Sequence, residues 1–210
     1  MEIHTVTEGA TEFTCNAYLL AGDPPALVDA GTMPGVDDVI ADHVEDLDAV
    51  YLTHQHGDHV GELDAVLDRF DADLYAHGDH PRRTGGLEDG RTIDLGGESY
   101  EVVHTPGHAA DHVSFVGSER VFSGDVVVYN DGAFDDGSFG RTDYPGQSRE
   151  RLIGSLRTLL DRLPETVSGL YAGHGDIYRA DPTGPDESVR AVIERALARA
   201  ERRDPKYPDE

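Results

Sequence analysis

The sequence has little basic charge, and this shortage excludes one large class of partners. Lys and Arg together number 17, against 42 Asp and Glu, so the formal net charge of the 210-residue chain is -25. Lys206 is the only lysine. A surface this acidic repels the phosphate backbone of nucleic acid. We therefore expect no nucleic-acid partner.

Long apolar runs, a signal peptide and paired cysteines are also absent. No apolar run approaches the roughly 18 residues that a membrane-spanning helix needs. The first residues, M-E-I-H-T-V, lack the basic and apolar regions of a signal peptide. Cys15 is the only cysteine, so it forms no intramolecular disulfide, and its alternating apolar surroundings predict a packing residue and not a nucleophile. We expect a cytoplasmic protein without membrane contact.

Acidity combined with scarce lysine admits two interpretations. It is typical of halophilic proteins from cells that keep molar salt inside, where the Debye length is only about 3 Å and repulsion between carboxylates is screened. An ordinary acidic cytoplasmic protein is the alternative.

The segment Thr53 to Gly61 reads T-H-Q-H-G-D-H-V-G and places four metal-ligand side chains in six consecutive positions. His54 and His56 point the same way in an extended run because side chains alternate along a strand. Asp58 and His59 follow the flexible Gly57 and can reach a neighbouring point. One short loop can therefore serve two adjacent metal ions.

Two metal ions need more ligands than this loop supplies. A zinc-type ion takes about four donors, with one position left for water in a catalytic site. His108 in H-T-P-G-H, Asp125 in F-S-G-D and His174 in A-G-H-G each follow a predicted strand and adjoin glycine. Several strand ends thus converge on one edge of a sheet, where a carboxylate such as Asp125 is suited to bridge two cations.

This series of motifs resembles, in order and spacing, the signature of the metallo-β-lactamase fold hydrolases. The resemblance implies that Asp125 bridges two metals and that Asp29, in A-L-V-D-A-G-T, supports the site from behind the ligands. A turn carboxylate that caps local amides is the alternative for Asp29. The remaining ligands that the resemblance implies are His54, His56 and His108 for the first metal and Asp58, His59 and His174 for the second.

A further segment, F-G-R-T-D-Y-P-G from Phe139 to Gly146, is similar to the subgroup that contains hydroxyacylglutathione hydrolases, known as glyoxalase II, and persulfide dioxygenases. We predict two zinc ions, with iron or manganese as alternatives. A metal lowers the pKa of bound water from about 15.7 to about 7 and gives a hydroxide nucleophile. Asp58 is the predicted catalytic residue that orients this hydroxide and takes its proton.

A small thioester is the predicted substrate, because a leaving thiolate needs little protonation. The basic residues that would bind glutathione are not identifiable beyond His174, so another low-molecular-weight thiol conjugate is the expected class. Phe139, Tyr144 and Tyr178 are candidate pocket walls. Arg141 either contacts the substrate or forms a loop ion pair with Asp143.

Three other functions stay open. They are an iron persulfide dioxygenase, which uses fewer of the ligands, a phosphodiesterase, nuclease or lactonase of the same fold, and a metal-binding protein without activity. The complete ligand set and the absence of a basic face favour the hydrolase. The other histidines, among them His112, are predicted to be surface or ordinary hydrogen-bonding residues, with His112 as the first exception to consider because it lies four residues beyond His108.

Short apolar strands alternate with helical patterns along the chain, without repeats or linkers, and predict one α/β domain over residues 1–210. Strands are expected at residues 13–20, 26–29, 49–52, 73–76, 100–103, 113–116, 121–122, 126–129 and 167–172. Helices are expected at residues 61–70, from Arg149 with Ser148 as its cap, and at residues 187–203. The family resemblance adds a four-layer αββα sandwich of two mixed β-sheets.

Overall fold

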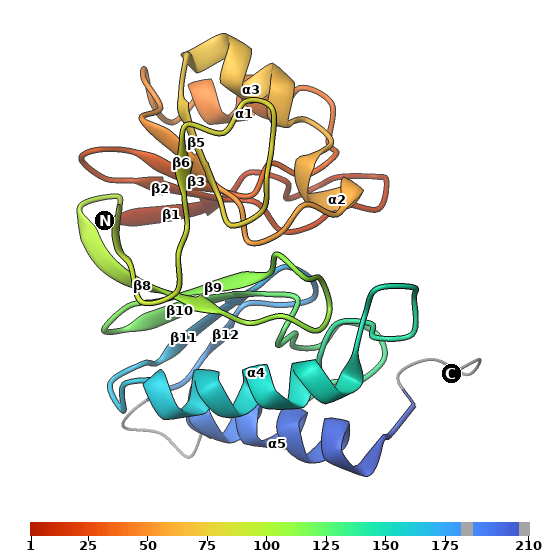
Figure 1. Ribbon diagram of the computed structural model, residues 1–210. Helices are drawn as coiled ribbons and strands as arrows, with labels where there is room; N and C mark the ends of the chain where they lie inside the picture. The colour runs from red at the N-terminus through yellow and green to blue at the C-terminus, as the bar shows by residue number, and fades with distance from the viewer. Residues whose placement is uncertain (182–186, 206–210) are drawn as a thin grey trace.

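Two mixed β-sheets lie face to face in the computed structural model, which describes residues 1–181 and 187–205 (Figure 1). The first sheet has the strand order β1-β2-β3-β4-β5-β6, with β1 (Glu2–Thr5), β2 (Tyr18–Ala21), β3 (Ala26–Val28), β4 (Ala49–Tyr51), β5 (Asp73–Ala76) and β6 (Gly85–Gly86). The second has the order β12-β11-β10-β9-β8-β7, with β7 (Thr92–Leu95), β8 (Glu98–His104), β9 (Val113–Val116), β10 (Arg120–Gly124), β11 (Gly169–Ala172) and β12 (Tyr178–Arg179).

Helices cover the outer face of each sheet, so the predicted four-layer αββα arrangement is confirmed (Figure 1). The helices on the side of the first sheet are α1 (Val36–Ala41), α2 (Gly57–Val60) and α3 (Leu63–Phe70), and those on the side of the second are α4 (Arg149–Arg162) and α5 (Val189–Arg202). None of the described helices is long and apolar enough to cross a bilayer.

Each of the two long helices has a serine cap, and Ser148 is the cap predicted from the sequence. Ser148 Oγ accepts a hydrogen bond from the backbone N–H of Arg151 at 3.3 Å, and Ser188 Oγ accepts one from Ala191 at 3.2 Å. Each bond satisfies one of the free N–H groups of a first helical turn. The apolar residues of each helix recur at helical spacing and are buried against the second sheet.

Three buried clusters fill the three spaces between the four layers. One, which includes Val50 and Leu74, joins the first sheet to α1 and α3. Another, which includes Tyr18 and Phe122, lies between the sheets. The third, which includes Leu170, joins the second sheet to α4 and α5. Burial of apolar area at these three interfaces drives the layers together.

Two predicted strands are wrong in part. The strand expected at residues 13–20 begins only at Tyr18, because the backbone N–H groups of Cys15 and Asn16 bond to the carbonyls of Asp58 and Gly173 in place of a neighbouring strand. Residues 126–129 form only isolated bridges, Val128 with Ser138 and Tyr129 with Gly175. Both segments lie beside the predicted metal site.

Candidate metal centre

The predicted ligands follow strands whose carboxyl ends meet. β3 and β4 are parallel, as are β10 and β11, so the residues after each pair emerge at the same edge of their sheet. Asp29 follows β3, the histidine-rich loop follows β4, Asp125 follows β10 and His174 follows β11. A backbone hydrogen bond from Val113 N to the carbonyl oxygen of Thr53, 2.8 Å long, joins the two sheets at this edge.

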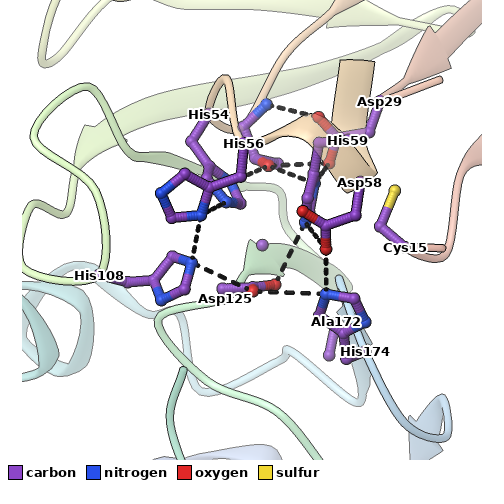
Figure 2. Close-up of polar contacts among 12 residues, drawn as sticks. Cys15, Asp29, His54, His56, Asp58, His59, His108, Asp125, Ala172 and His174 are labelled. Atoms are coloured by element: carbon purple, nitrogen blue, oxygen red, sulfur yellow. Dashed lines mark hydrogen bonds and ion pairs between the residues drawn. The ribbon is translucent and has the colours of Figure 1, made fainter. Parts of the chain in front are cut away.

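One group of three histidines brings its ring nitrogens together. His56 Nδ1 lies 3.1 Å from His54 Nε2 and 2.9 Å from His108 Nε2 (Figure 2). Nitrogens bound at about 2.1 Å to one tetrahedral ion would lie about 3.4 Å apart. The spacing of these nitrogens is therefore close to that of ligands that share an ion.

Hydrogen bonds on the far side of two of these rings assign their tautomers. His108 Nδ1 donates to the carbonyl oxygen of Arg141 at 2.9 Å. The hydroxyl of Thr53 donates to Asp29 Oδ2 at 2.8 Å, so its oxygen accepts from His54 Nδ1 at 3.1 Å. Burial lowers the pKa of His54 and of His108, which favours neutral rings. Their Nε2 atoms thus present lone pairs to the group.

A second group contains Asp58, His59 and His174. His174 Nε2 lies 2.9 Å from Asp58 Oδ2, and His59 Nε2 lies 3.8 Å from the same oxygen. His59 Nδ1 donates to Asp29 Oδ2 at 2.8 Å, which leaves Nε2 of that ring directed into the group.

Asp125 faces both groups with one carboxylate (Figure 2). Its Oδ2 atom lies 3.3 Å from His108 Nε2 and 3.5 Å from His174 Nε2, while Oδ1 lies 3.5 Å from His59 Nε2. These distances to both groups are what a bridging carboxylate requires.

Two atoms at the centre of this arrangement show that a cation fits it. His59 Nε2 and Asp125 Oδ1 are buried and have no hydrogen-bond partner among the described residues. Buried polar atoms are normally paired, because an unpaired one costs about 1–3 kcal/mol. A nitrogen and a carboxylate oxygen are both donors to zinc-type ions, so a shared cation would satisfy both.

The charges of the cluster also suit a cation. Burial alone would raise the pKa of Asp125, but His174, His59 and His108 lower it well below its ordinary value. Asp58 is likewise ionised, because its hydrogen bond to His174 and the charge of His59 lower its pKa despite partial burial. Burial would lower the pKa of His59, yet Cys15, Asp29 and Asp125 raise it well above its ordinary value. The carboxylates around His59 Nε2 and Asp125 Oδ1 therefore favour a positive charge between these two atoms.

Comparison with known proteins agrees with the geometry. Residues 10–174 match the sequence profile described as the Metallo-beta-lactamase superfamily. The chain belongs to that superfamily. It is 29% identical over 196 residues to the hydroxyacylglutathione hydrolase GloC of Haemophilus influenzae, a match that covers 79% of this chain and 87% of that protein. The predicted resemblance to the glyoxalase II-like subgroup is thus confirmed.

The chain is also similar to a longer hydroxyacylglutathione hydrolase and to several solved structures. The chain is 33% identical over 153 residues to the hydroxyacylglutathione hydrolase of Vibrio cholerae, across 71% of this chain but 56% of that protein. Among solved structures, ETHE1 from Myxococcus xanthus has a TM-score of 0.72 at 24% identity and covers 100% of this chain and 94% of its own, which shows a common fold. TTHA1623, solved in a di-iron-bound form, has a TM-score of 0.63 at 30% identity over 79% of this chain and 89% of that chain.

A cavity of about 560 Å³ lies beside the candidate metal centre. Phe13 is 76% exposed, and its ring stacks on that of His174 with centroids 5.0 Å apart and an interplanar angle of 15°. In another part of the lining, the Arg141 guanidinium lies 4.3 Å from the centre of the Tyr144 ring. The lining residues include Phe13, His56, Asp58, His108, Asp125, Asn130, Asp131, Arg141, Tyr144, Gln147 and His174.

Two of the four predicted substrate contacts line this cavity and two do not. Arg141 and Tyr144 line it, and Arg141 also forms the ion pair with Asp143, with nitrogen–oxygen distances of 2.9 and 2.5 Å. Phe139 is instead fully buried in the core below Arg149, whose guanidinium lies 4.2 Å from the ring centre. Gly140, the next residue, faces the cavity, so the side chain of Phe139 is directed into the core.

Tyr178 is the other predicted wall that lies elsewhere. Its ring packs on Tyr129 with centroids 4.7 Å apart, and its hydroxyl donates to the carbonyl oxygen of Glu187 at 2.6 Å. Sequence reasoning also missed several side chains that do line the cavity. None of them belongs to a motif with a recognisable chemical role, and they include Phe13, Asn130, Asp131 and Gln147.

Proposed function

We propose that the protein is a hydrolase that uses two divalent cations to cleave a small thioester. The observation that carries the proposal is the carboxylate of Asp125, which faces two groups of converging donor atoms beside an open cavity. The names of the curated relatives support hydrolysis of an acyl-thiol bond. Zinc is the proposed metal, with iron or manganese as alternatives.

Each cation would have its own set of protein ligands. The cations would supply Lewis acidity, which activates water and polarises a carbonyl oxygen. Asp125 would be shared, and its negative charge would offset the repulsion between the two ions. The first ion would take His54, His56 and His108, and the second would take Asp58, His59 and His174.

Asp58 is the proposed proton acceptor. It lines the cavity, its side chain is 20% exposed, and its lowered pKa keeps the carboxylate ionised at neutral pH. Its Oδ2 atom lies 2.9 Å from His174 Nε2, which places that oxygen among the ligands proposed for the second cation. The other oxygen of a carboxylate in this position can align an attacking water and take its proton.

The cavity walls suit a small thiol conjugate. Phe13 and Tyr144 offer apolar faces to the body of the substrate, and the Arg141 guanidinium, paired with Asp143, lines the cavity beside Tyr144. A thiolate needs little protonation as it leaves, so a single proton acceptor suffices for the reaction. Cleavage of a phosphodiester would require a proton donor or direct metal contact at the leaving alkoxide.

A substrate panel tests this proposal. S-lactoyl thioesters, a lactone, a β-lactam and a bis-aryl phosphodiester would be assayed side by side, before chelation, after chelation and after zinc is restored. We expect thioesters to be cleaved fastest and chelation to abolish the activity reversibly. Faster metal-dependent cleavage of the phosphodiester than of every thioester would contradict the proposal.

Persulfide oxidation is the second candidate. One grouping in the cluster, His54, His59 and Asp125, brings its donor atoms within 4.8 Å of one another. Two histidines and a carboxylate are the ligand set typical of non-haem iron oxygenases. Oxygen uptake with a persulfide, together with one equivalent of bound iron, would favour this activity over hydrolysis.

A further inference from the structure

His112 is a buried histidine that lies beside the segments carrying Thr105, Thr53 and His54. It is fully buried and directly precedes β9, and its carbonyl oxygen accepts from Thr105 N at 2.9 Å. The next residue, Val113, makes the bond to Thr53 that joins the two sheets. The His112 ring lies 5.0 Å from that of His54. His112 therefore touches the metal centre, although none of the converging groups of donor atoms in the described residues includes it.

A chain of hydrogen bonds fixes the His112 ring. The backbone N–H of Asp125 donates to His112 Nε2 at 2.9 Å, so the ring proton lies on Nδ1 and donates to Thr105 Oγ1 at 2.8 Å. Ser114 Oγ donates to the carbonyl oxygen of Ser123 at 3.2 Å, which leaves it as the acceptor for the Thr105 hydroxyl at 3.1 Å. Both ring nitrogens of His112 are therefore engaged, and neither has a lone pair for a metal.

Gly124, the residue before Asp125, has no side chain and so leaves room for the His112 ring. Gly124 has a φ of +50°, and a Cβ atom there would lie 2.5 Å from His112 Nε2. On the other side, Gly140 N donates to the carbonyl oxygen of Asp125 at 2.6 Å. Both backbone polar groups of Asp125 are thus held, its N–H by His112 and its C=O by Gly140. The preceding glycine leaves the chain free to turn if either bond is lost.

We propose that His112 is a positioning residue whose Nε2 atom fixes the backbone of Asp125, so that the Asp125 carboxylate faces both metal groups. This inference rests on the proposed function, because it takes Asp125 to be shared by two cations. The carboxylate approaches His108 on one side and His59 on the other, and rotation of its backbone would carry it away from one of them. Loss of the His112 acceptor should weaken cation binding without changing the number of ligands.

Two substitutions test the roles of the two ring nitrogens of His112 separately. In His112→Gln the side-chain oxygen reaches the position of Nε2 and keeps an acceptor for Asp125 N. In His112→Asn the side chain reaches only the position of Nδ1, which keeps the contact with Thr105 and loses that acceptor. Zinc affinity and stoichiometry would be measured on the full chain by competition with a chromophoric chelator. We expect His112→Asn to bind zinc about 10–100-fold more weakly, on the scale of ligand-supporting residues, and His112→Gln to stay close to the wild type.

Two further variants separate positioning from loss of stability. Val66→Ala removes buried methyl groups from α3, far from this chain of bonds, and should leave zinc affinity unchanged. Thr105→Val removes the partner of Nδ1 and should weaken zinc binding in the same direction, which keeps the inference testable if His112→Asn does not fold. A wild type that binds no zinc would overturn the proposed function and this inference with it. A wild type that binds two zinc ions, with His112→Asn equal to it or His112→Gln as weak as His112→Asn, would overturn the positioning role alone.

Discussion

Asp29 Oδ2 accepts a hydrogen bond from His59 Nδ1 at 2.8 Å, and the same carboxylate holds Thr53 at the start of the loop that carries His54 and His56. Its Oδ1 atom accepts from the backbone N–H of Thr53, and Oδ2 accepts from the Thr53 hydroxyl, both at 2.8 Å. Thr53 in turn contacts His54. One buried carboxylate therefore orients a ring in each of the two proposed metal groups.

Asp29→Asn should weaken metal binding by about 10–100-fold, because an amide cannot accept all three of these hydrogen bonds. Asparagine tolerates the left-handed backbone that Asp29 adopts, with a φ of 58°, so the change acts on the side-chain chemistry. Asp71→Asn is the matched control, because Asp71 is exposed and has a φ of 51°. Chelator competition measures the affinities, and equal values for the two variants would contradict this role for Asp29.

Asp58→Asn should lower turnover of a thioester by roughly 100-fold or more, the scale of a general acid-base group. The amide keeps the shape of the side chain but cannot take a proton from water. Because Asp58 is also a proposed ligand, turnover would be compared at measured, equal metal content. Turnover within a few-fold of the wild type under that condition would remove Asp58 from the mechanism.

Phe13→Ala should lower kcat/KM for thioesters by about tenfold, or about 1.4 kcal/mol, through loss of an aromatic wall of the cavity. The ring stacks on His174, so its removal also opens that ligand to water. Phe13→Leu keeps apolar bulk and should retain more of the activity. Identical kcat/KM values for the wild type and Phe13→Ala would show that the substrate does not contact this side chain.

Molar potassium chloride should raise the thermal unfolding midpoint of the protein. With a formal net charge of -25, carboxylates repel one another in the compact state, and concentrated cations screen that repulsion. Thermal unfolding would be followed from low to molar salt, with sucrose as a control for preferential exclusion. A midpoint that does not change with salt would assign the acidity to solubility alone.

The sequence predicts the layers and the metal cluster far better than it predicts the cavity. Ligands of one cation must be of a few residue types and must follow strand ends, so His54, His108 and Asp125 are visible in short motifs. Cavity walls need only be near, and any side chain can fill that position. The sequence therefore predicts Phe13 only as a strand residue. It predicts Phe139 as a cavity wall, although the side chain of Phe139 is directed into the core.

The role of His112 likewise could not be predicted from the sequence. Its spacing from His108 is visible in the sequence, but the acceptor that it offers to Asp125 depends on the meeting of β8, β9 and β10. Hydrogen bonds between segments that are distant in sequence are set by tertiary packing, and local patterns do not encode them.

The metal content of protein purified without added metal tests the central claim most directly. Six donor side chains arranged around the shared carboxylate of Asp125 predict close to two equivalents of a transition metal per chain, with zinc as the proposed ion. Elemental analysis on a sample of known protein concentration gives this number. About one equivalent of iron and no second metal would contradict the dinuclear hydrolase.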